Sequence, residues 1–273
     1  MIEREHLPRR KLLPRLADSG APGWTSYTLP GEPLRLGTAL IDADDADRLQ
    51  EVAQDSITGS VLFSPVAGIT MLVVPPFPIE LAEDYSEVYT RPLLDLLDRK
   101  RNVAVLLLRK GGFTMGYFRA GVLADSKTDQ RFVKNRHRKG GQSQRRFDRI
   151  REKQIHELFD KACGEAREKF EPYEDEIEWV LFGGDRHTLI DFRKQCGYFE
   201  KFGDRMIERV LGVPGNPRRA SLDELPQEIW SSEVYTAMEE PPPAPTRRKL
   251  RQKPSPVALG AEPRDGEEEI GSR

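Results

Sequence analysis

The second half of the chain alternates between short apolar runs and one long amphipathic stretch. Three apolar runs, at 103–108, 113–118 and 121–123, are separated by glycine-containing turns and predict a three-strand meander. A polar stretch at 124–139 predicts a loop. Apolar residues then recur every three or four positions over 144–170, which predicts a single amphipathic helix about 40 Å long.

After this helix the pattern continues to alternate between strands and helices. The sequence predicts strands at 179–182 and 206–210, and helices at 186–195 and 221–238. A strand meander followed by alternating helices and strands is typical of an α/β fold with a mixed sheet. We therefore expect helices to cover both faces of this sheet.

The first hundred residues predict a small mixed α/β segment. Short strands are expected at 24–28 and 34–40, and two more within 61–75, whereas 42–54 and 80–100 have helical patterns. The acidic residues are scattered singly, as on solvated faces. We therefore assign this segment only to architecture or docking.

The C-terminal end differs in composition from the rest of the chain. Residues 241–273 contain seven of the 21 prolines and almost no large apolar side chains, so they cannot bury enough surface to offset their ordering entropy. We expect a disordered tail there. The predicted organisation is an N-terminal segment at 1–101, a second α/β domain at 102–240 and the tail at 241–273.

Charge is distributed unevenly along the chain. The totals of 43 basic and 45 acidic residues give a formal net charge of −2, which by itself argues against a polyanionic partner. Residues 131–153, however, hold ten Lys or Arg and two acids, so this basic segment carries +8 and the remainder −10. Because phosphates attract such a segment and repel the acidic remainder, we expect a nucleic acid to be approached with the basic segment first.

Several classes of protein and site are not supported by the sequence. No apolar run reaches the roughly 18 residues that span a bilayer, and the N-terminus does not resemble a signal peptide, so we expect a cytoplasmic protein with no membrane contact. Neither a P-loop nor a dinucleotide fingerprint occurs, and the HExxH-like stretch from His156 has Asp160 in place of the second histidine. No cofactor or metal ion is expected.

The two cysteines, Cys163 and Cys196, lie 33 residues apart without a CxxC partner. This spacing supports neither a disulfide framework nor a zinc site. We expect both to be buried, reduced thiols.

Within the basic segment, two glycines and a glutamine stand directly before the long predicted helix. Gly140 and Gly141 allow positive φ and a close backbone approach to a ligand, and the helix N-terminus favours negative charge on a nearby oxygen. Gln142 has no useful pKa, but its backbone and side-chain amides can stabilise an oxyanion and position a water. This chemistry fits hydrolysis of an ester whose leaving alcohol is held by a large RNA machine.

The run Gly140-Gly141-Gln142-Ser143, followed by Arg146-Phe147, Arg149 and Arg151, resembles the GGQSxxRFxRxR motif of eukaryotic and archaeal class one release factors. In that family the loop belongs to the middle domain, enters the ribosomal peptidyl transferase centre and promotes hydrolysis of peptidyl-tRNA. The resemblance covers about 102–238. It implies a ribonuclease H-like mixed sheet with a long helix after the GGQ loop.

Within this superfamily the chain looks like the Vms-like branch, whose stand-alone hydrolases free nascent chains from stalled large subunits. It lacks a NIKS motif, and 273 residues are few for a three-domain termination factor. The resemblance implies a peptidyl-tRNA hydrolase in ribosome rescue and quality control. Its partners would be the large ribosomal subunit, peptidyl-tRNA and ribosomal RNA, and it would act as a monomer without a cofactor.

The resemblance also implies the roles of individual residues. Gln142 corresponds to the active glutamine, and Gly140 and Gly141 let the loop enter the site. Gln144 is the second candidate, because the Vms-like branch has a Gly-Ser-Gln arrangement and Gln144 follows Ser143. Basic residues expected to contact RNA phosphates are Arg136, Arg138, Lys139, Arg145, Arg146 and Arg149.

Two other functions are compatible with parts of the pattern. A catalytically inactive ribosome- or RNA-binding module could keep the same fold and basic segment. A metal-dependent nuclease needs clustered carboxylates on the sheet, but the first meander strand has no acid, and Asp125 and Asp129 fall in the predicted loop. We therefore do not expect nuclease activity. Phe147 and Ile150 are expected to anchor the long helix in the core.

Overall fold

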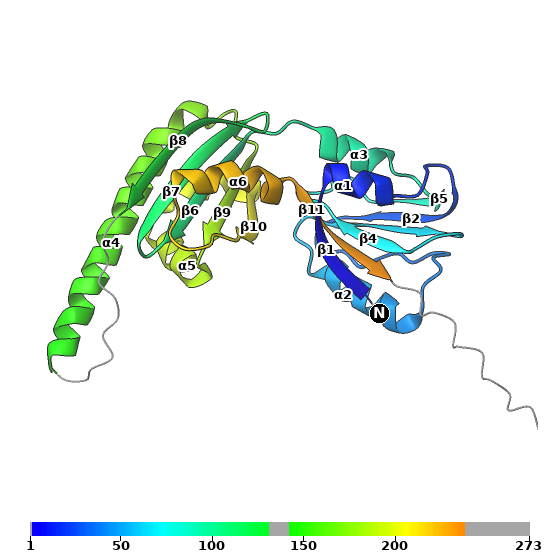
Figure 1. Ribbon diagram of the computed structural model, residues 1–273, viewed down its shortest axis with the longest axis horizontal. Helices are drawn as coiled ribbons and strands as arrows, with labels where there is room; N and C mark the ends of the chain where they lie inside the picture. Colours follow the sequence, from blue (N-terminus) through cyan, green and yellow to red (C-terminus); the bar gives the residue numbers. More distant parts are fainter. Residues whose placement is uncertain (1, 131–141, 238–273) are drawn as a thin grey trace, which may run out of the picture. The chain divides into compact units, whose positions relative to one another are not determined.

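The computed structural model describes residues 2–130 and 142–237. Residues 1, 131–141 and 238–273, which include the predicted tail, lie outside the described residues, and the side chains at 142–145 do as well. The described elements form two β-sheets with their helices (Figure 1). No helix in the described ranges is both long and apolar enough to cross a bilayer.

Five strands from the N-terminal part of the chain and β11 from residues 231–237 build a six-stranded antiparallel sheet in the order β1-β11-β4-β3-β2-β5. Helix α2 covers one face through Leu49 and Ala53, and α1 and α3 cover the other through Leu12 and Leu93. The elements are β1 (Ile2–Pro8), α1 (Arg9–Leu12), η1 (Leu13–Arg15), β2 (Pro22–Thr28), α2 (Ala43–Gln54), β3 (Ser60–Pro65), β4 (Met71–Val74), β5 (Glu83–Glu87), α3 (Arg91–Asp98) and β11 (Ser231–Ala237).

Local signals explain where the predictions for this sheet succeeded and failed. The helix predicted at 42–54 is confirmed as α2, and Asp42 caps it by accepting a hydrogen bond from the Asp45 amide at 2.9 Å. The helix predicted at 80–100 is wrong in its first half, which forms β5. Pro92 has no amide hydrogen and fits only the first turn of a helix, so α3 begins at Arg91. The strand predicted at 34–40 is absent from the described secondary structure.

The second sheet has five strands in the order β10-β9-β6-β7-β8. The pairs among β6, β7 and β8 are antiparallel, whereas β6, β9 and β10 are parallel, so the sheet is mixed as predicted. The strands are β6 (Val103–Arg109), β7 (Gly112–Arg119), β8 (Val122–Gln130), β9 (Trp179–Gly184) and β10 (Met206–Leu211). The loop predicted from residue 124 is therefore wrong as far as Gln130, because polar residues of β8 pair along β7.

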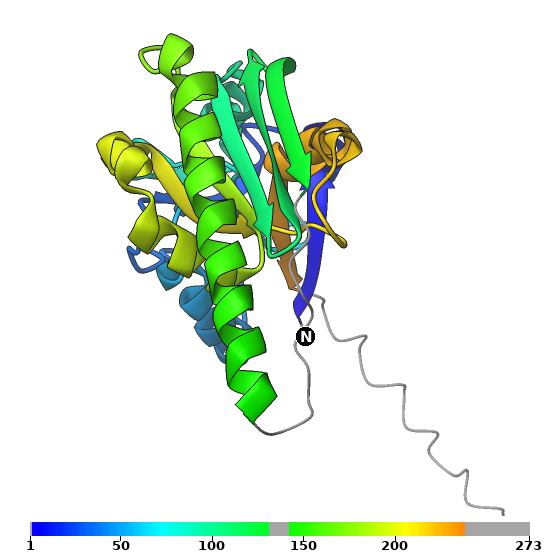
Figure 2. The ribbon, with the colours of Figure 1, turned by 90° about the vertical axis from the view of Figure 1, so that its left-hand side faces the viewer.

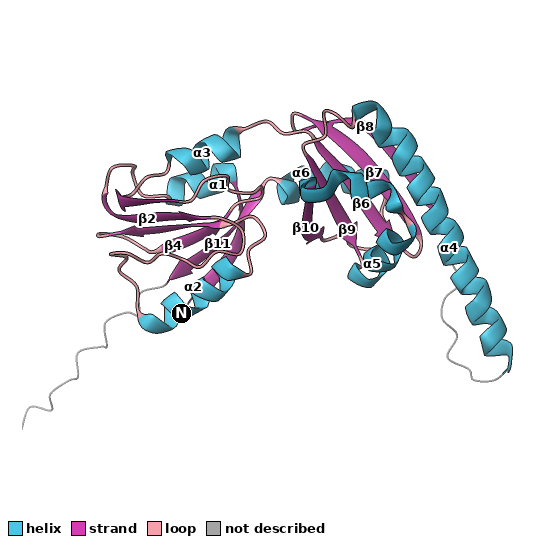
Figure 3. Cartoon of the chain, turned by 180° about the vertical axis from the view of Figure 1, so that it is seen from behind, coloured by secondary structure: helices cyan, strands magenta, loops and turns pink. Residues whose placement is uncertain are grey.

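Helices cover both faces of this second sheet, as expected (Figure 3). Strand β6 shows the reason, because its side chains alternate. Leu106 and Leu108 pack with α4 and α5, whereas Val105 and Leu107 pack with α6. The helices are α4 (Gln142–Phe170), η2 (Glu171–Tyr173), α5 (Arg186–Gln195), η3 (Gly197–Arg205) and α6 (Arg219–Ile229).

The helix predicted at 221–238 ends early. Helix α6 stops at Ile229, and residues 231–237 form β11, which pairs with β1 and β4 in the first sheet. Serine, valine, tyrosine and threonine suit an extended strand better than a helix. The chain from 1 to 239 is one compact unit. The boundaries proposed at residues 101 and 240 remain predictions.

Candidate functional site

Helix α4 begins at Gln142, two residues earlier than predicted. Gln144 and Arg145 follow in its first turn, so both candidate glutamines lie where the backbone amides of a helix have no intrahelical partner. The side chains of these three residues are outside the described part. So are five other predicted site residues, namely Arg136, Arg138, Lys139, Gly140 and Gly141.

Among the described side chains of α4, the fully buried ones all lie in its second half, and Ile155, just before it, is partly buried against the same core cluster. The buried side chains start at Leu158 and Phe159 and continue to Phe170, and none of those described from 146 to 157 is fully buried. Figure 2 shows this first half extending past the strands. Phe147 is 38% exposed, so its expected role as a core anchor is wrong: it lies on the half of α4 whose described side chains are not fully buried.

Two of the predicted phosphate contacts are described, and both are exposed. Arg146 and Arg149 lie on the first half of α4. Side chains in this position can reach a large partner that the sheet itself does not touch. The structure thus brings the candidate glutamines and the basic residues 145–149 together on one projecting helical segment.

A cleft of about 620 Å³ lies where this segment meets α5 and the end of β6. Its cationic lining residues are Lys110 after β6, Arg151 on α4 and Lys194 on α5. Among the described residues none of the three has an ion-pair partner, and the buried Arg151 Nε has no hydrogen-bond partner. Glu152 and Asp191 also line the cleft, so one positive charge is in excess. Unpaired cations of this kind can bind phosphate oxygens.

Asp185 caps α5 close to this cleft. Its carboxylate accepts hydrogen bonds from Thr188 N at 2.9 Å and Thr188 Oγ1 at 2.6 Å. These bonds lower the pKa of Asp185, and the charge of Lys110 contributes to the same shift. The preceding Gly184 has a φ of +122°, and a Cβ there would lie 2.1 Å from the Leu108 carbonyl oxygen. Only glycine therefore fits this turn from β9 into α5.

The acids considered for nuclease chemistry have other partners. Asp125 and Asp129 lie on β8 rather than in a loop, and they pair with Lys169 and Lys161 of α4. Lys127 and Glu165 form a third pair between the same two elements, at 3.1 Å. The described residues contain no group of three or more His, Cys, Asp or Glu side chains that could hold a metal ion.

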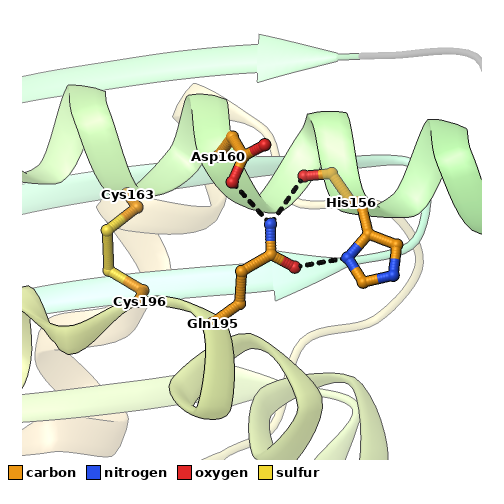
Figure 4. The surroundings of a disulfide bond; sticks show 5 residues. All are labelled: His156, Asp160, Cys163, Gln195 and Cys196. Atoms are coloured by element: carbon orange, nitrogen blue, oxygen red, sulfur yellow. Dashed lines mark hydrogen bonds between the residues drawn. A yellow bond between two sulfur atoms is a disulfide. The ribbon is translucent and has the colours of Figure 1, made fainter.

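The prediction of two reduced thiols is wrong. Cys163 on α4 and Cys196 at the end of α5 form a disulfide, with 5.6 Å between their Cα atoms (Figure 4). The two helices pack against the same sheet face, which brings together cysteines that are 33 residues apart. Spacing along the chain carries no information about such packing.

The structure adds three residues that the sequence did not indicate, namely Lys110, Lys194 and Gln195. Lys110 had a weak signal, because it precedes a glycine turn at a strand end, where ligands of α/β sheets often bind. Lys194 and Gln195 had none. Both stand in the last turn of α5 and acquire their position from its packing against α4.

Comparison with known proteins finds a family to which this part of the chain is similar. Residues 101–235 match the model of the Actinobacteria/Chloroflexi VLRF1 release factor. Over these residues the chain is similar to the VLRF1 release factor family. They are called the release-factor region below, and they contain both candidate glutamines, the projecting half of α4 and the cleft.

Curated relatives are similar over part of their length. The chain is 31% identical over 176 residues to peptide chain release factor subunit 1 of Archaeoglobus fulgidus, a match that covers 61% of this chain and 42% of that protein. The protein of the same name from Methanopyrus kandleri is 32% identical over 158 residues, covering 57% and 38%. The chain thus spans about two fifths of these relatives.

A solved archaeal translation termination factor, aRF1, is similar with a TM-score of 0.36 and 18% identity. The match covers 81% of this chain and 71% of that one.

Proposed function

We propose that this protein hydrolyses the ester bond of peptidyl-tRNA on the ribosome and so releases nascent chains during ribosome rescue. The observation that carries the proposal is Gly140-Gly141-Gln142 at the start of a helix that projects from a release-factor region. We propose the stalled large subunit as the target. The partners are peptidyl-tRNA and ribosomal RNA, and the protein acts in the cytoplasm as a monomer.

In the proposed reaction a water molecule attacks the ester carbonyl that links the peptide to the tRNA. A new C–O bond forms, the carbonyl oxygen becomes an oxyanion, and collapse of this intermediate breaks the bond to the tRNA hydroxyl, which leaves with a proton. Gln142 supplies amide groups that orient the water and stabilise the oxyanion. The N-terminal end of α4 adds a favourable field for the same charge. Gly140 and Gly141 let the loop approach the ester.

We also propose that the five-stranded sheet is ribonuclease H-like. Its antiparallel meander β6-β7-β8 and the two parallel strands β9 and β10 on the other side of β6 support this assignment. The residues that would hold the tRNA and ribosomal RNA are the basic residues before and after Gln142.

The cleft cations extend the proposed phosphate contacts. We expect Lys110→Ala with Arg151→Ala to weaken ribosome binding about tenfold at physiological salt, because two phosphate contacts are lost. The slope of log affinity against log salt should fall by about 2. Binding measured by co-sedimentation over a salt series tests this. The matched control, Arg91→Ala with Arg219→Ala, removes two arginines paired to Asp95 and Asp223 elsewhere, and an equal loss there would contradict the assignment.

The decisive test of the proposed function is peptide release. Purified protein is mixed with isolated large subunits that carry labelled peptidyl-tRNA, and free peptide and intact tRNA are both measured. Release with full-length tRNA supports ester hydrolysis. Ribosome binding without release would instead support an inactive binding module, and magnesium-dependent shortening of the tRNA would support a nuclease.

A further inference from the structure

Helix α4 enters the core near residue 158, and we call this point, at Leu158 and Phe159, the support of α4. The part of α4 before the support projects from it. The first buried side chain among those described on α4 is Leu158, and sixteen residues of the helix, 142–157, precede it. At 1.5 Å per residue this segment is about 24 Å long. A rotation of about 5° at the support therefore moves Gln142 by about 2 Å, and misplacement by 1 Å can slow a reaction about 100-fold. The angle of α4 at its support thus determines where Gln142 is presented.

Two neighbouring residues at the end of α5 hold α4 at this support (Figure 4). Gln195 Nε2 donates hydrogen bonds to the His156 carbonyl oxygen at 3.0 Å and to Asp160 Oδ1 at 2.5 Å. Gln195 Oε1 lies 2.7 Å from His156 Nδ1. The adjacent Cys196 is bonded to Cys163. We call these five residues the clamp.

The hydrogen bonds of the clamp have only one consistent assignment. The Asp160 carboxylate and the His156 carbonyl can only accept, so the amide nitrogen of Gln195 must face both. Its Oε1 then faces His156, which donates from Nδ1. One glutamine thus holds the backbone and two side chains of α4, spanning the step from the projecting half to the buried half.

We propose that Gln195 and the Cys163–Cys196 pair are positioning groups that fix the angle of α4 and thereby aim Gln142. Gln195 and Cys196 contact α4 within one or two turns of Leu158. Contacts at this point restrain the angle between α4 and the sheet directly. The effect on peptide release rests on the proposed function, whereas the restraint on α4 does not. Neither group touches the reacting atoms.

One half of the clamp is sensitive to redox conditions. A dithiol reduces the disulfide by exchange, so that two electrons and two protons give two cysteine thiols while the dithiol becomes a disulfide. Of the clamp, the Gln195 contacts then remain. Because reducing compartments keep most thiols reduced, the stiffness of the α4 support depends on the redox state around the protein.

The angle of α4 is measured directly by the distance between spin labels at positions 149 and 208, carried on an incorporated non-cysteine residue. Arg149 lies on the projecting half and Glu208 is exposed on β10. The oxidised wild type should give a narrow distribution of distances. Reduction by a dithiol, Cys163→Ser with Cys196→Ser, and Gln195→Ala should each widen it. The triple variant combines Gln195→Ala with Cys163→Ser and Cys196→Ser. It should widen the distribution by more than the sum of the separate changes, because either half of the clamp alone still restrains the angle of α4.

Gln227→Ala is the matched control, since Gln227 is exposed on α6, on the other face of the sheet. Its distribution should equal that of the wild type. Circular dichroism establishes folding, and if the triple variant does not fold, the oxidised and reduced wild type carry the test. A distribution that is equally narrow with and without the clamp would overturn the proposal.

Release measured under single-turnover conditions tests the consequence. The triple variant should lose about tenfold or more in rate at saturating ribosomes, while half-saturation shifts by less than about threefold. A merely structural role would not separate rate from binding in this way. A wider distribution with an unchanged release rate would overturn the aiming role. A wild type that releases nothing would refute the proposed function, but the distances would still decide whether the clamp restrains α4.

Discussion

Replacing Gln142 by alanine is expected to slow peptide release by at least about 100-fold, the usual effect of removing one oxyanion donor from an active site. Ribosome binding should stay within about threefold, because the basic residues proposed to bind phosphates remain. Alanine is a good helix former, so α4 should still begin at the same position. The measurement is single-turnover release from large subunits, with binding measured in parallel.

Gln144→Ala is the control for this prediction. Gln144 lies two residues further along α4 than Gln142. We expect its release rate to stay within about threefold of the wild type, in line with a surface substitution away from the chemistry. The reverse result, with Gln142→Ala fully active and Gln144→Ala inactive, would transfer the active role to Gln144.

The release-factor region was largely readable from sequence because its elements have strong local signals. Strands β6 and β7 have continuous apolar runs between glycine turns, and α4 has a regular apolar spacing in its second half. Asp185 directly precedes the helix predicted at 186–195, and its side chain caps that helix. These features depend on residues that are only a few positions apart in the sequence. The periodicity of apolar residues reports on interactions over that short distance.

The elements that sequence reading missed are decided by distant partners. Strand β11 pairs with β1 from the opposite end of the chain, so its few residues showed no independent pattern after α6. The polar strand β8 is held by β7 and by lysines of α4, such as Lys161 and Lys169. The disulfide likewise depends on how α4 and α5 pack, which no spacing rule contains.

The candidate site also has one part that the sequence shows and one part that depends on packing. The glycines, the glutamines and the basic segment are contiguous in sequence, so a motif could be recognised before any fold was known. Lys110 and Lys194 become neighbours of Arg151 only when β6, α5 and α4 have packed. The proposed role of Gln195 depends on α4 having a half whose side chains are not buried. The apolar spacing of the sequence predicted the whole helix but did not show at which residue burial begins, so this role could not be predicted.

Shortening Phe159 to alanine is expected to lower the free energy of unfolding by about 3–5 kcal/mol, the usual cost of emptying a buried aromatic site. Phe159 is 2% exposed, and its ring meets that of Phe192 on α5 edge to face, with 5.7 Å between the centroids. The loss is a large share of the roughly 5–15 kcal/mol that stabilises most domains. Urea denaturation, with the midpoint and slope compared to the wild type, measures it.

Ile190→Ala on α5 is the matched control, because Ile190 is 45% exposed. Its change should stay within about 1 kcal/mol. Equal losses in the two variants would contradict the placement of the α4 support at residues 158 and 159, because a support must be the place where α4 first enters the core. If Phe159→Ala is instead the costly change, the burial that anchors α4 begins at this support. The angle of the remaining half then depends on contacts at that support, which is the condition under which residues on α5 can control a glutamine about 24 Å away.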